Sequence, residues 1–144
     1  MIAIDSNMWA FYLDRESDEH EYVAESIENA LDMEEIVLNT VIIIEVAHYL
    51  IKNLGPVVGK EKLDTFLRYP FTIVDLDYQS MLEAIAELAR YSHIGIGGRD
   101  ATILSLMRHE KIERIMTHDT AFKRINWLEI IDPIPENCAR EISS

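Results

Sequence analysis

The stretch Met1-Ile2-Ala3-Ile4-Asp5-Ser6-Asn7 decides the fold class of this 144-residue chain. Its three consecutive apolar residues predict a short buried strand, which Asp5 ends. The small polar residues that follow are typical of a turn that caps a helix. The chain thus opens with a strand that leads into a helix start, and the same order repeats along the rest of the sequence.

Further short apolar runs alternate with helical patterns. Strands are predicted at residues 36–38, 71–74, 114–116 and 129–131, the last of them an edge strand stopped by Pro133. Helices are predicted at residues 19–31, 41–54, 60–68, 78–91 and 99–109, with a short helix near 120–124 and a frayed one at 136–144. This alternation predicts an α/β fold with a mostly parallel sheet of four to five short strands, flanked by helices. We expect one domain over residues 1–144.

The composition supports a compact protein with a real core. Apolar residues make up 49% of the chain. No apolar run reaches the length of about 18 residues that a membrane span needs, and the first residues lack the basic and apolar regions of a secretion signal. The only cysteine is Cys138, which fits a reducing compartment. We therefore expect a cytoplasmic protein with no membrane segment.

The formal net charge of −13 argues, taken alone, against a polyanion as partner. The distribution of the charge weakens this objection. Residues 1–35 hold 11 of the 26 acidic residues and one of the 13 basic residues, so the remainder is close to neutral. Most of the excess lies in residues 14–35, called here the acidic segment. The simpler interpretation is a solvated helix face, and the alternative is a surface for a basic partner.

Four acidic residues stand in places that call for an explanation. Asp5 follows the first predicted strand and Asp119 follows the fourth, and sites in open parallel sheets form beyond such strand ends. Glu45 interrupts an apolar helix and is the only charge between residues 36 and 51. Asp100 falls on the apolar face of its helix, the face expected to pack on the sheet.

Each of these acids, taken alone, has a structural explanation. A buried carboxylate can pair with an arginine, for which Arg99 and Arg108 are the candidates, and Asp100 can cap its helix. An uncompensated charge that faces a core costs several kcal/mol. Four acids directed towards one edge of the sheet favour a bound cation, because like charges do not cluster stably without one.

Carboxylate oxygens are hard ligands, which suit Mg²⁺ or Mn²⁺. An ion held in this way activates a water molecule and stabilises the charge that develops on a phosphodiester oxygen. Four carboxylates supply ligands for one ion, and for a second once a substrate phosphate is present. The residues by themselves therefore indicate a metal site suited to phosphodiester hydrolysis.

The four acids also lie in motifs that resemble those of the PIN-domain family, in particular its stand-alone VapC-like toxin ribonucleases. The resemblance covers nearly the whole chain. It rests on a strand that ends in an acid, a glutamate early in an apolar helix, an aspartate that opens a helix after glycines, and a Thr-x-Asp-x-x-Phe pattern. Here these motifs are Ile4-Asp5-Ser6-Asn7, Ile44-Glu45-Val46-Ala47, Gly97-Gly98-Arg99-Asp100 and Thr117-His118-Asp119-Thr120-Ala121-Phe122.

The resemblance implies a Mg²⁺- or Mn²⁺-dependent endoribonuclease, commonly a homodimer, that acts on RNA. In VapC-like members it also implies a small antitoxin protein as partner. By this resemblance Asp5, Asp100 and Asp119 are metal ligands, and Glu45 is a ligand or the residue that orients the attacking water. All four are the candidate catalytic residues.

Five further residues match less specific positions. By the resemblance, Asn7 and Thr117 could hold a carboxylate or a water beside the metal, although turn and cap chemistry explains them equally well. Arg99, Lys123 and Arg124 lie close to the motif acids in sequence and are the candidates for contact with phosphate.

Other functions stay open at this point. An RNA-processing PIN nuclease without an antitoxin would share these features, whereas a non-catalytic PIN interaction module usually loses an acid, and this chain retains all four. A phosphoryl-transfer enzyme of the haloacid-dehalogenase kind, with Asp5 as nucleophile, would need a second aspartate in place of Asn7. The histidines show no zinc-like spacing, and we expect no catalytic role for His48 or His118.

Overall fold

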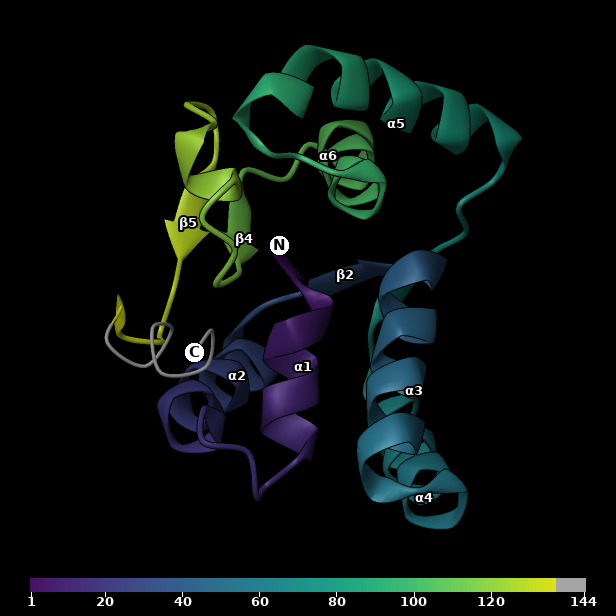
Figure 1. Cartoon of the computed structure of the whole chain (residues 1–144), viewed down its shortest axis with the longest axis vertical. Coiled ribbons are helices and arrows are strands. Elements are labelled where there is room, and N and C mark those ends of the chain that lie inside the picture. Colours follow the sequence, from purple (N-terminus) through teal and green to yellow (C-terminus); the bar gives the residue numbers. More distant parts are fainter. Residues whose placement is uncertain (137–144) are drawn as a thin grey trace.

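The computed structural model describes residues 1–136 and contains one sheet of five strands, in which all neighbours pair in parallel. The strand order is β3-β2-β1-β4-β5, so the first strand lies in the middle of the sheet (Figure 1). The predicted parallel α/β fold and the edge position of the last strand are thereby confirmed. The strands are β1 Ile2–Ile4, β2 Ile36–Asn39, β3 Thr72–Val74, β4 Arg114–Met116 and β5 Glu129–Ile131.

Helices cover both faces of the sheet (Figure 1). α5 and α6 pack together on one face, α1 and α2 pack together on the other, and α3 pairs with α4 and contacts α1. No helix in the described part of the chain is long and apolar enough to cross a membrane. The helices are α1 Ser6–Leu13, α2 His20–Met33, α3 Thr40–Leu54, α4 Pro56–Phe66, α5 Tyr78–Tyr91 and α6 Gly98–Glu110, with short 3₁₀ turns η1 Ser92–Ile94 and η2 Phe122–Arg124.

Two of the predicted helices differ from the structure. The helix expected over 60–68 begins earlier, because Gly55 leaves α3 with a φ of 86° and Pro56 then opens α4 in the first-turn position that proline favours. The Gly55-Pro56 turn thus ends one helix and starts the next. The short helix expected near 120–124 is a single 3₁₀ turn, η2. The frayed helix expected over 136–144 lies, beyond residue 136, outside the described residues.

Close packing between α3 and α4 fixes the position of α3 beside the sheet. A Cβ atom at Gly59 would lie 2.6 Å from the carbonyl oxygen of Leu50, so only glycine fits at this crossing. Next to it, the fully buried Trp9 of α1 contacts the rings of Phe66 and Phe71 edge-on, with ring centroids 5.1 Å apart in each pair. The core therefore holds α1 and α3, which carry two of the four motifs, against each other.

The middle of the acidic segment forms α2. Val23 and Ile27 of this helix face the core, which leaves its acidic side chains in water. Before the helix, Asp14 is buried and accepts a hydrogen bond from the hydroxyl of Tyr49 at 3.0 Å. A solvated acidic face is thus present on α2 itself, whose exposed acids are Glu21, Glu25, Glu28 and Asp32.

Candidate active site

Asp5 stands at the centre of the sheet edge at which the strands end. It follows β1, the middle strand, and is 1% exposed. Its Oδ1 accepts a hydrogen bond from the backbone N–H of Ser6 at 2.7 Å and so caps α1. Its Oδ2 accepts a hydrogen bond from the hydroxyl of Thr117 at 2.8 Å. The expected capping turn is present, and the same side chain links β1 to the exit of β4.

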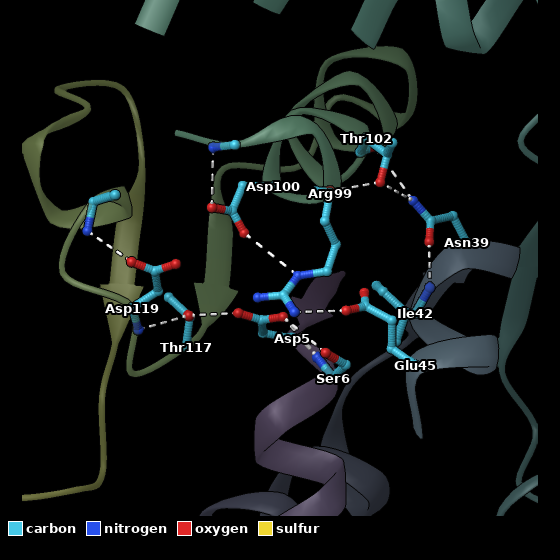
Figure 2. Close-up of polar contacts among 12 residues, drawn as sticks. Asp5, Ser6, Asn39, Ile42, Glu45, Arg99, Asp100, Thr102, Thr117 and Asp119 are labelled. Atoms are coloured by element: carbon cyan, nitrogen blue, oxygen red, sulfur yellow. Dashed lines mark hydrogen bonds and ion pairs between the residues drawn. The ribbon is translucent and has the colours of Figure 1, made fainter. Parts of the chain in front are cut away.

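Thr117 joins two of the four acids. Besides donating to Asp5, its hydroxyl oxygen accepts a hydrogen bond from the backbone N–H of Asp119 at 3.1 Å. The backbone N–H of Ala121 in turn donates to Oδ1 of Asp119 at 2.9 Å. Figure 2 shows Thr117 between the carboxyl groups of Asp5 and Asp119. Because β1 and β4 are neighbours, the first and fourth motifs meet although Thr117 follows Asp5 by 112 residues.

Glu45 reaches the site from α3, which begins where β2 ends. Asn39 caps this helix by accepting a hydrogen bond from the backbone N–H of Ile42 at 2.8 Å. The amide of Asn39 also donates to the carbonyl oxygen of Thr102 in α6 at 3.3 Å, so the cap ties the two helices together. The side chain of Glu45 is 19% exposed, whereas the neighbouring Ile44 is 65% exposed. The charge that interrupts the apolar run therefore does face inward.

Asp100 is the third residue of α6 and is 6% exposed. It shares its helix face with buried apolar residues such as Ile103 and Leu104, as the sequence predicted. Its Oδ2 accepts a hydrogen bond from the backbone N–H of Gly97 at 3.4 Å, in the manner of a capping box. The cap accounts for one oxygen only, because Oδ1 is buried and has no hydrogen-bond partner within residues 1–136.

Arg99, one residue before Asp100, extends across the site to Glu45. Its Nη1 lies 2.7 Å from Oε2 of Glu45, and its Nε lies 3.9 Å from Oδ1 of Asp100. The predicted pairing of a motif acid with Arg99 is therefore present, and Figure 2 places the guanidinium between Asp5, Asp100 and Glu45. Like Asp100, Glu45 keeps one buried oxygen, Oε1, without a hydrogen-bond partner in the described chain.

The carboxyl groups affect one another's ionisation. Burial raises the pKa of Asp5, and the nearby charge of Asp119 adds to this effect. Burial likewise raises the pKa of Glu45, although the charge of Arg99 opposes the rise. Burial, followed by the charges of Asp119 and Asp5, raises the pKa of Asp100 to about 6. One arginine thus does not offset the combined effect of burial and of the neighbouring carboxylates on these pKa values.

Comparison of the sequence with models of known families identifies the family of this chain. A family model described as PIN domain matches residues 2–128, which is most of the chain. The chain belongs to the PIN-domain family. A comparison with curated proteins found no match.

Several solved structures share the PIN fold of this chain. VapC20 from Mycobacterium tuberculosis, described as a sarcin-ricin loop cleaving toxin, has a TM-score of 0.72 and 15% identity, covering 85% of this chain and 93% of that one. VapBC2 from Rickettsia felis, bound to a promoter DNA fragment, has a TM-score of 0.70 and 21% identity, covering 92% of this chain and 98% of that one. FitAcB from Neisseria gonorrhoeae has a TM-score of 0.69 and 17% identity, covering 92% of this chain and 98% of that one. At these identities the likeness concerns the fold.

PIN nucleases generally use divalent metal ions, and the donor set of this PIN domain fits one. The candidate ligands are all carboxylate oxygens, and two of these, on Glu45 and Asp100, are buried without a hydrogen-bond partner among the described residues. As the side chains stand, no three Asp, Glu, His or Cys residues within 1–136 are grouped closely enough to hold an ion. The residues therefore suit a metal chemically, but they have to move before they can surround it.

Of the three predicted phosphate contacts, Arg99 is the one that the structure brings to the carboxylates. Lys123 forms an ion pair with Asp132, with its Nζ 2.6 Å from Oδ2, so its charge is already partly neutralised. Arg124 is exposed on η2. Asn7 lies beside the site, but its Oδ1 is buried without a hydrogen-bond partner in the described part of the chain. Unlike Thr117, Asn7 therefore does not accept a bond that would orient it.

Asp132 is a polar residue at the same sheet edge that the sequence analysis did not single out. It follows β5, as Asp5 follows β1, and that position was the available signal. Its Oδ2 lies 2.9 Å from Nδ1 of His118, so the pair ties the exit of β4 to the exit of β5. The other ring nitrogen of His118 is buried and has no hydrogen-bond partner within residues 1–136.

Lys52 is the second residue that the sequence analysis missed. A cavity of about 380 Å³ opens beside the site, and Lys52 and His48 line it together with Glu45 and Arg99. Lys52 follows Glu45 by seven residues, which is about two helical turns and therefore the same helix face. That spacing was visible in the sequence. The lysine that lines this cavity together with Arg99 thus comes from α3, and not from the segment after Asp119 that contains Lys123 and Arg124.

Proposed function

We propose that this PIN domain is a metal-dependent endoribonuclease that hydrolyses phosphodiester bonds in RNA, and that it is the toxin of a VapBC-type toxin–antitoxin pair. The observation that carries the proposal is the gathering of four acids at one sheet edge, where Glu45 and Asp100 each keep a buried carboxylate oxygen without a hydrogen-bond partner among the described residues. Buried carboxylates that are not compensated destabilise a fold, and a bound cation removes that cost.

In this proposal Asp5, Asp100 and Asp119 hold Mg²⁺ or Mn²⁺, and Glu45 is either a further ligand or orients the attacking water. The bound ion supplies Lewis-acid chemistry, which activates water and stabilises charge on the phosphodiester oxygens. Thr117 is a positioning residue, because its hydroxyl fixes the carboxylate of Asp5 and the main chain of Asp119.

The cavity beside Glu45 is the proposed place of the RNA backbone. Arg99 and Lys52 line it and supply positive charge to a protein whose formal net charge is −13. Arginine contacts phosphate with two parallel hydrogen bonds, whereas lysine acts as a point charge. Because the cations near the site are few, we expect RNA binding to be weak and to fall only gradually with added salt.

A small antitoxin protein is the proposed partner. Similar folds occur in solved complexes named VapBC, and the sequence resembles VapC-like toxins. If the protein is a toxin, its expression alone should arrest growth, and a small protein encoded immediately upstream should relieve the arrest. Growth that is unaffected by a chain that cleaves RNA in vitro would instead favour an RNA-processing nuclease without an antitoxin.

A homodimer through α5 is the third part of the proposal. Four apolar side chains form a stripe along this helix, and a two-fold axis can pair such a stripe with its own copy. Ile85→Glu should shift the molar mass measured by light scattering from dimer to monomer. Gln79→Glu, which adds the same charge outside the stripe, should not. The stripe consists of Tyr78, Met81, Leu82 and Ile85, which are 73%, 39%, 42% and 52% exposed.

The deciding experiment is a cleavage assay on total RNA with Mn²⁺ or with EDTA, followed by mapping of the cut ends. Internal cuts that require Mn²⁺ and disappear in Asp100→Asn support the proposal. Glu25→Gln on α2 is the matched control, because it removes one exposed carboxylate that lies outside the four motifs. A folded wild-type protein that makes no cuts with either Mn²⁺ or Mg²⁺ would favour a non-catalytic interaction module.

A further inference from the structure

Arg99 occupies the space between the carboxylates that a metal ion would need (Figure 2). We propose that Arg99 is an internal counter-ion, which partly neutralises the acidic site in the absence of metal and moves to a substrate phosphate when metal binds. This inference rests on the proposed function, because it requires both a metal ion and an RNA phosphate at this site.

The contacts of Arg99 are those of a substitute cation. Within residues 1–136, every ion pair that involves one of the four motif acids is made by Arg99. Its guanidinium contacts acids from two different helices, Glu45 of α3 and Asp100 of α6. Asp5, from the turn after β1, lies beside the guanidinium in Figure 2, close enough for their charges to interact. One side chain thus compensates charge from three separate motifs.

Arg99 and a metal ion compete for the same oxygens. Oε2 of Glu45 is held by Nη1 at 2.7 Å, and Oδ1 of Asp100 faces Nε at 3.9 Å. A dication at these oxygens would lie within a few ångströms of the guanidinium, where the two positive charges repel each other strongly in a partly buried site. The absence of any closely grouped set of three ligands among the described residues agrees with a site held open by Arg99.

The side chain of Arg99 can leave without breaking the fold. It is 52% exposed, and ion pairs with so much contact to water contribute little to stability. The attachment of α3 to α6 does not depend on it, because Asn39 already donates hydrogen bonds to the carbonyl and the hydroxyl oxygens of Thr102, each at 3.3 Å. A purely structural bridge is therefore not needed at this position.

A cavity beside the site can receive the displaced side chain of Arg99. Arg99 borders the cavity of about 380 Å³ that Lys52 also lines. A guanidinium released from Glu45 would bring its paired N–H donors to this cavity, where they match the oxygens of a phosphate. The same charge would then serve two partners in turn, the protein's own carboxylates first and the RNA backbone afterwards.

The test measures Mn²⁺ binding to the metal-free protein without RNA, by calorimetry and by the electron paramagnetic resonance signal of free Mn²⁺. Arg99→Gln should bind Mn²⁺ about three- to tenfold more tightly than the wild type, because the competing cation is gone. Arg68→Gln is the matched control: Arg68 is exposed after α4, and its removal changes the net charge equally. Arg99→Lys keeps the charge but loses the paired N–H donors of the guanidinium. Its affinity for Mn²⁺ should lie between those of Arg99→Gln and Arg68→Gln.

The outcomes separate the inference from the proposed function. Equal or weaker Mn²⁺ binding by a folded Arg99→Gln, with clear binding by the wild type, would overturn the counter-ion and leave the metal site standing. No Mn²⁺ binding by any form would remove the metal site and the inference together. With Mn²⁺ saturating, Arg99→Gln should raise KM for a short RNA about tenfold more than it lowers kcat, and an unchanged KM would refute the transfer to phosphate.

A spectroscopic measurement on the wild type follows the side chain of Arg99 directly. The Nε–H group of Arg99, assigned in a ¹H–¹⁵N spectrum by its loss in Arg99→Lys, should shift when diamagnetic Mg²⁺ is added. The Nε–H of Arg68 should not shift. If the Arg99 resonance stays in place while other resonances around the site respond to Mg²⁺, the guanidinium does not move and the inference is wrong.

Discussion

The acidic segment and the acidic edge of the sheet carry charge of the same sign in different surroundings. On α2, side chains such as Glu21 and Glu25 lie in water, which screens them from one another. At the sheet edge Asp5 and Asp100 are 1% and 6% exposed, and burial raises the pKa of both. The acidic segment accounts for most of the net charge, yet the carboxyl groups whose pKa values are raised lie at the sheet edge. Burial and partners, not the number of acids, mark the site.

The largest expected effect comes from removing one buried acid. Asp5→Asn should lower Mn²⁺-dependent RNA cleavage by at least about 100-fold, more than is usual for residues that only support a ligand. The asparagine keeps an oxygen that can accept from Ser6, so the far-ultraviolet circular dichroism should not change. Cleavage by Asp5→Asn at the wild-type rate would show that the buried acids of the sheet edge are no more important for activity than the exposed acids of the acidic segment.

A smaller loss is expected when a supporting hydroxyl is removed. Thr117→Val deletes the group that donates to Asp5 and accepts from the backbone of Asp119, while keeping the size of the side chain. Cleavage should fall by about 10- to 100-fold, with weaker Mn²⁺ binding. Thr120→Val, at an exposed position close by, is the control and should retain full activity.

Stability should depend on pH through Asp100. Its pKa is about 6 in the folded protein against an ordinary value of 3.8, so the folded state binds more protons between these values. Stability therefore falls as the pH rises through that window. Without metal, Asp100→Asn should melt about 2–4 °C above the wild type at pH 7.5. This is the shift in Tm expected in a domain of this size when the free energy of unfolding rises by about 1 kcal/mol. The gap should narrow towards pH 4 in melting curves recorded with EDTA, and a gap independent of pH would contradict the raised pKa.

The smallest effect is expected on the acidic segment. The triple substitution Glu21→Gln, Glu25→Gln and Asp32→Asn removes three exposed charges from α2. Turnover of a short RNA should stay within about twofold of the wild type, because solvated charges act weakly over such distances. A large loss of turnover would mean that α2 takes part in the site, and that the two acidic regions are one.

The fold and the position of the four acids could be predicted because both follow local patterns. A strand of three apolar residues ends at Asp5, and Asp100 falls on an apolar helix face by its spacing alone. The start of α4 was missed because the Gly55-Pro56 turn both ends one helix and opens another.

The pairing of side chains across elements was harder to predict. Arg99 was one of two candidate partners for a buried acid, and only the packing of α6 beside α3 selects it, while Arg108 pairs with Glu87 instead. Lys123 was placed near the site by its proximity in sequence to Asp119, but the fold gives it Asp132 as partner. Such choices depend on distances in space, which a periodic pattern does not contain.

The central position of β1 sets the order in which the protein can be assembled on the ribosome. Asp5 is made well before one neighbour of its strand, β4, which begins only at Arg114. Chains emerge from the amino end, so the middle of the sheet waits, half paired, until β4 has been translated. The hydroxyl that fixes Asp5 and the fourth acid arrive directly after β4. For a nuclease, this means that a growing chain on its own messenger RNA has no working site before β4 and the turn after it have been made.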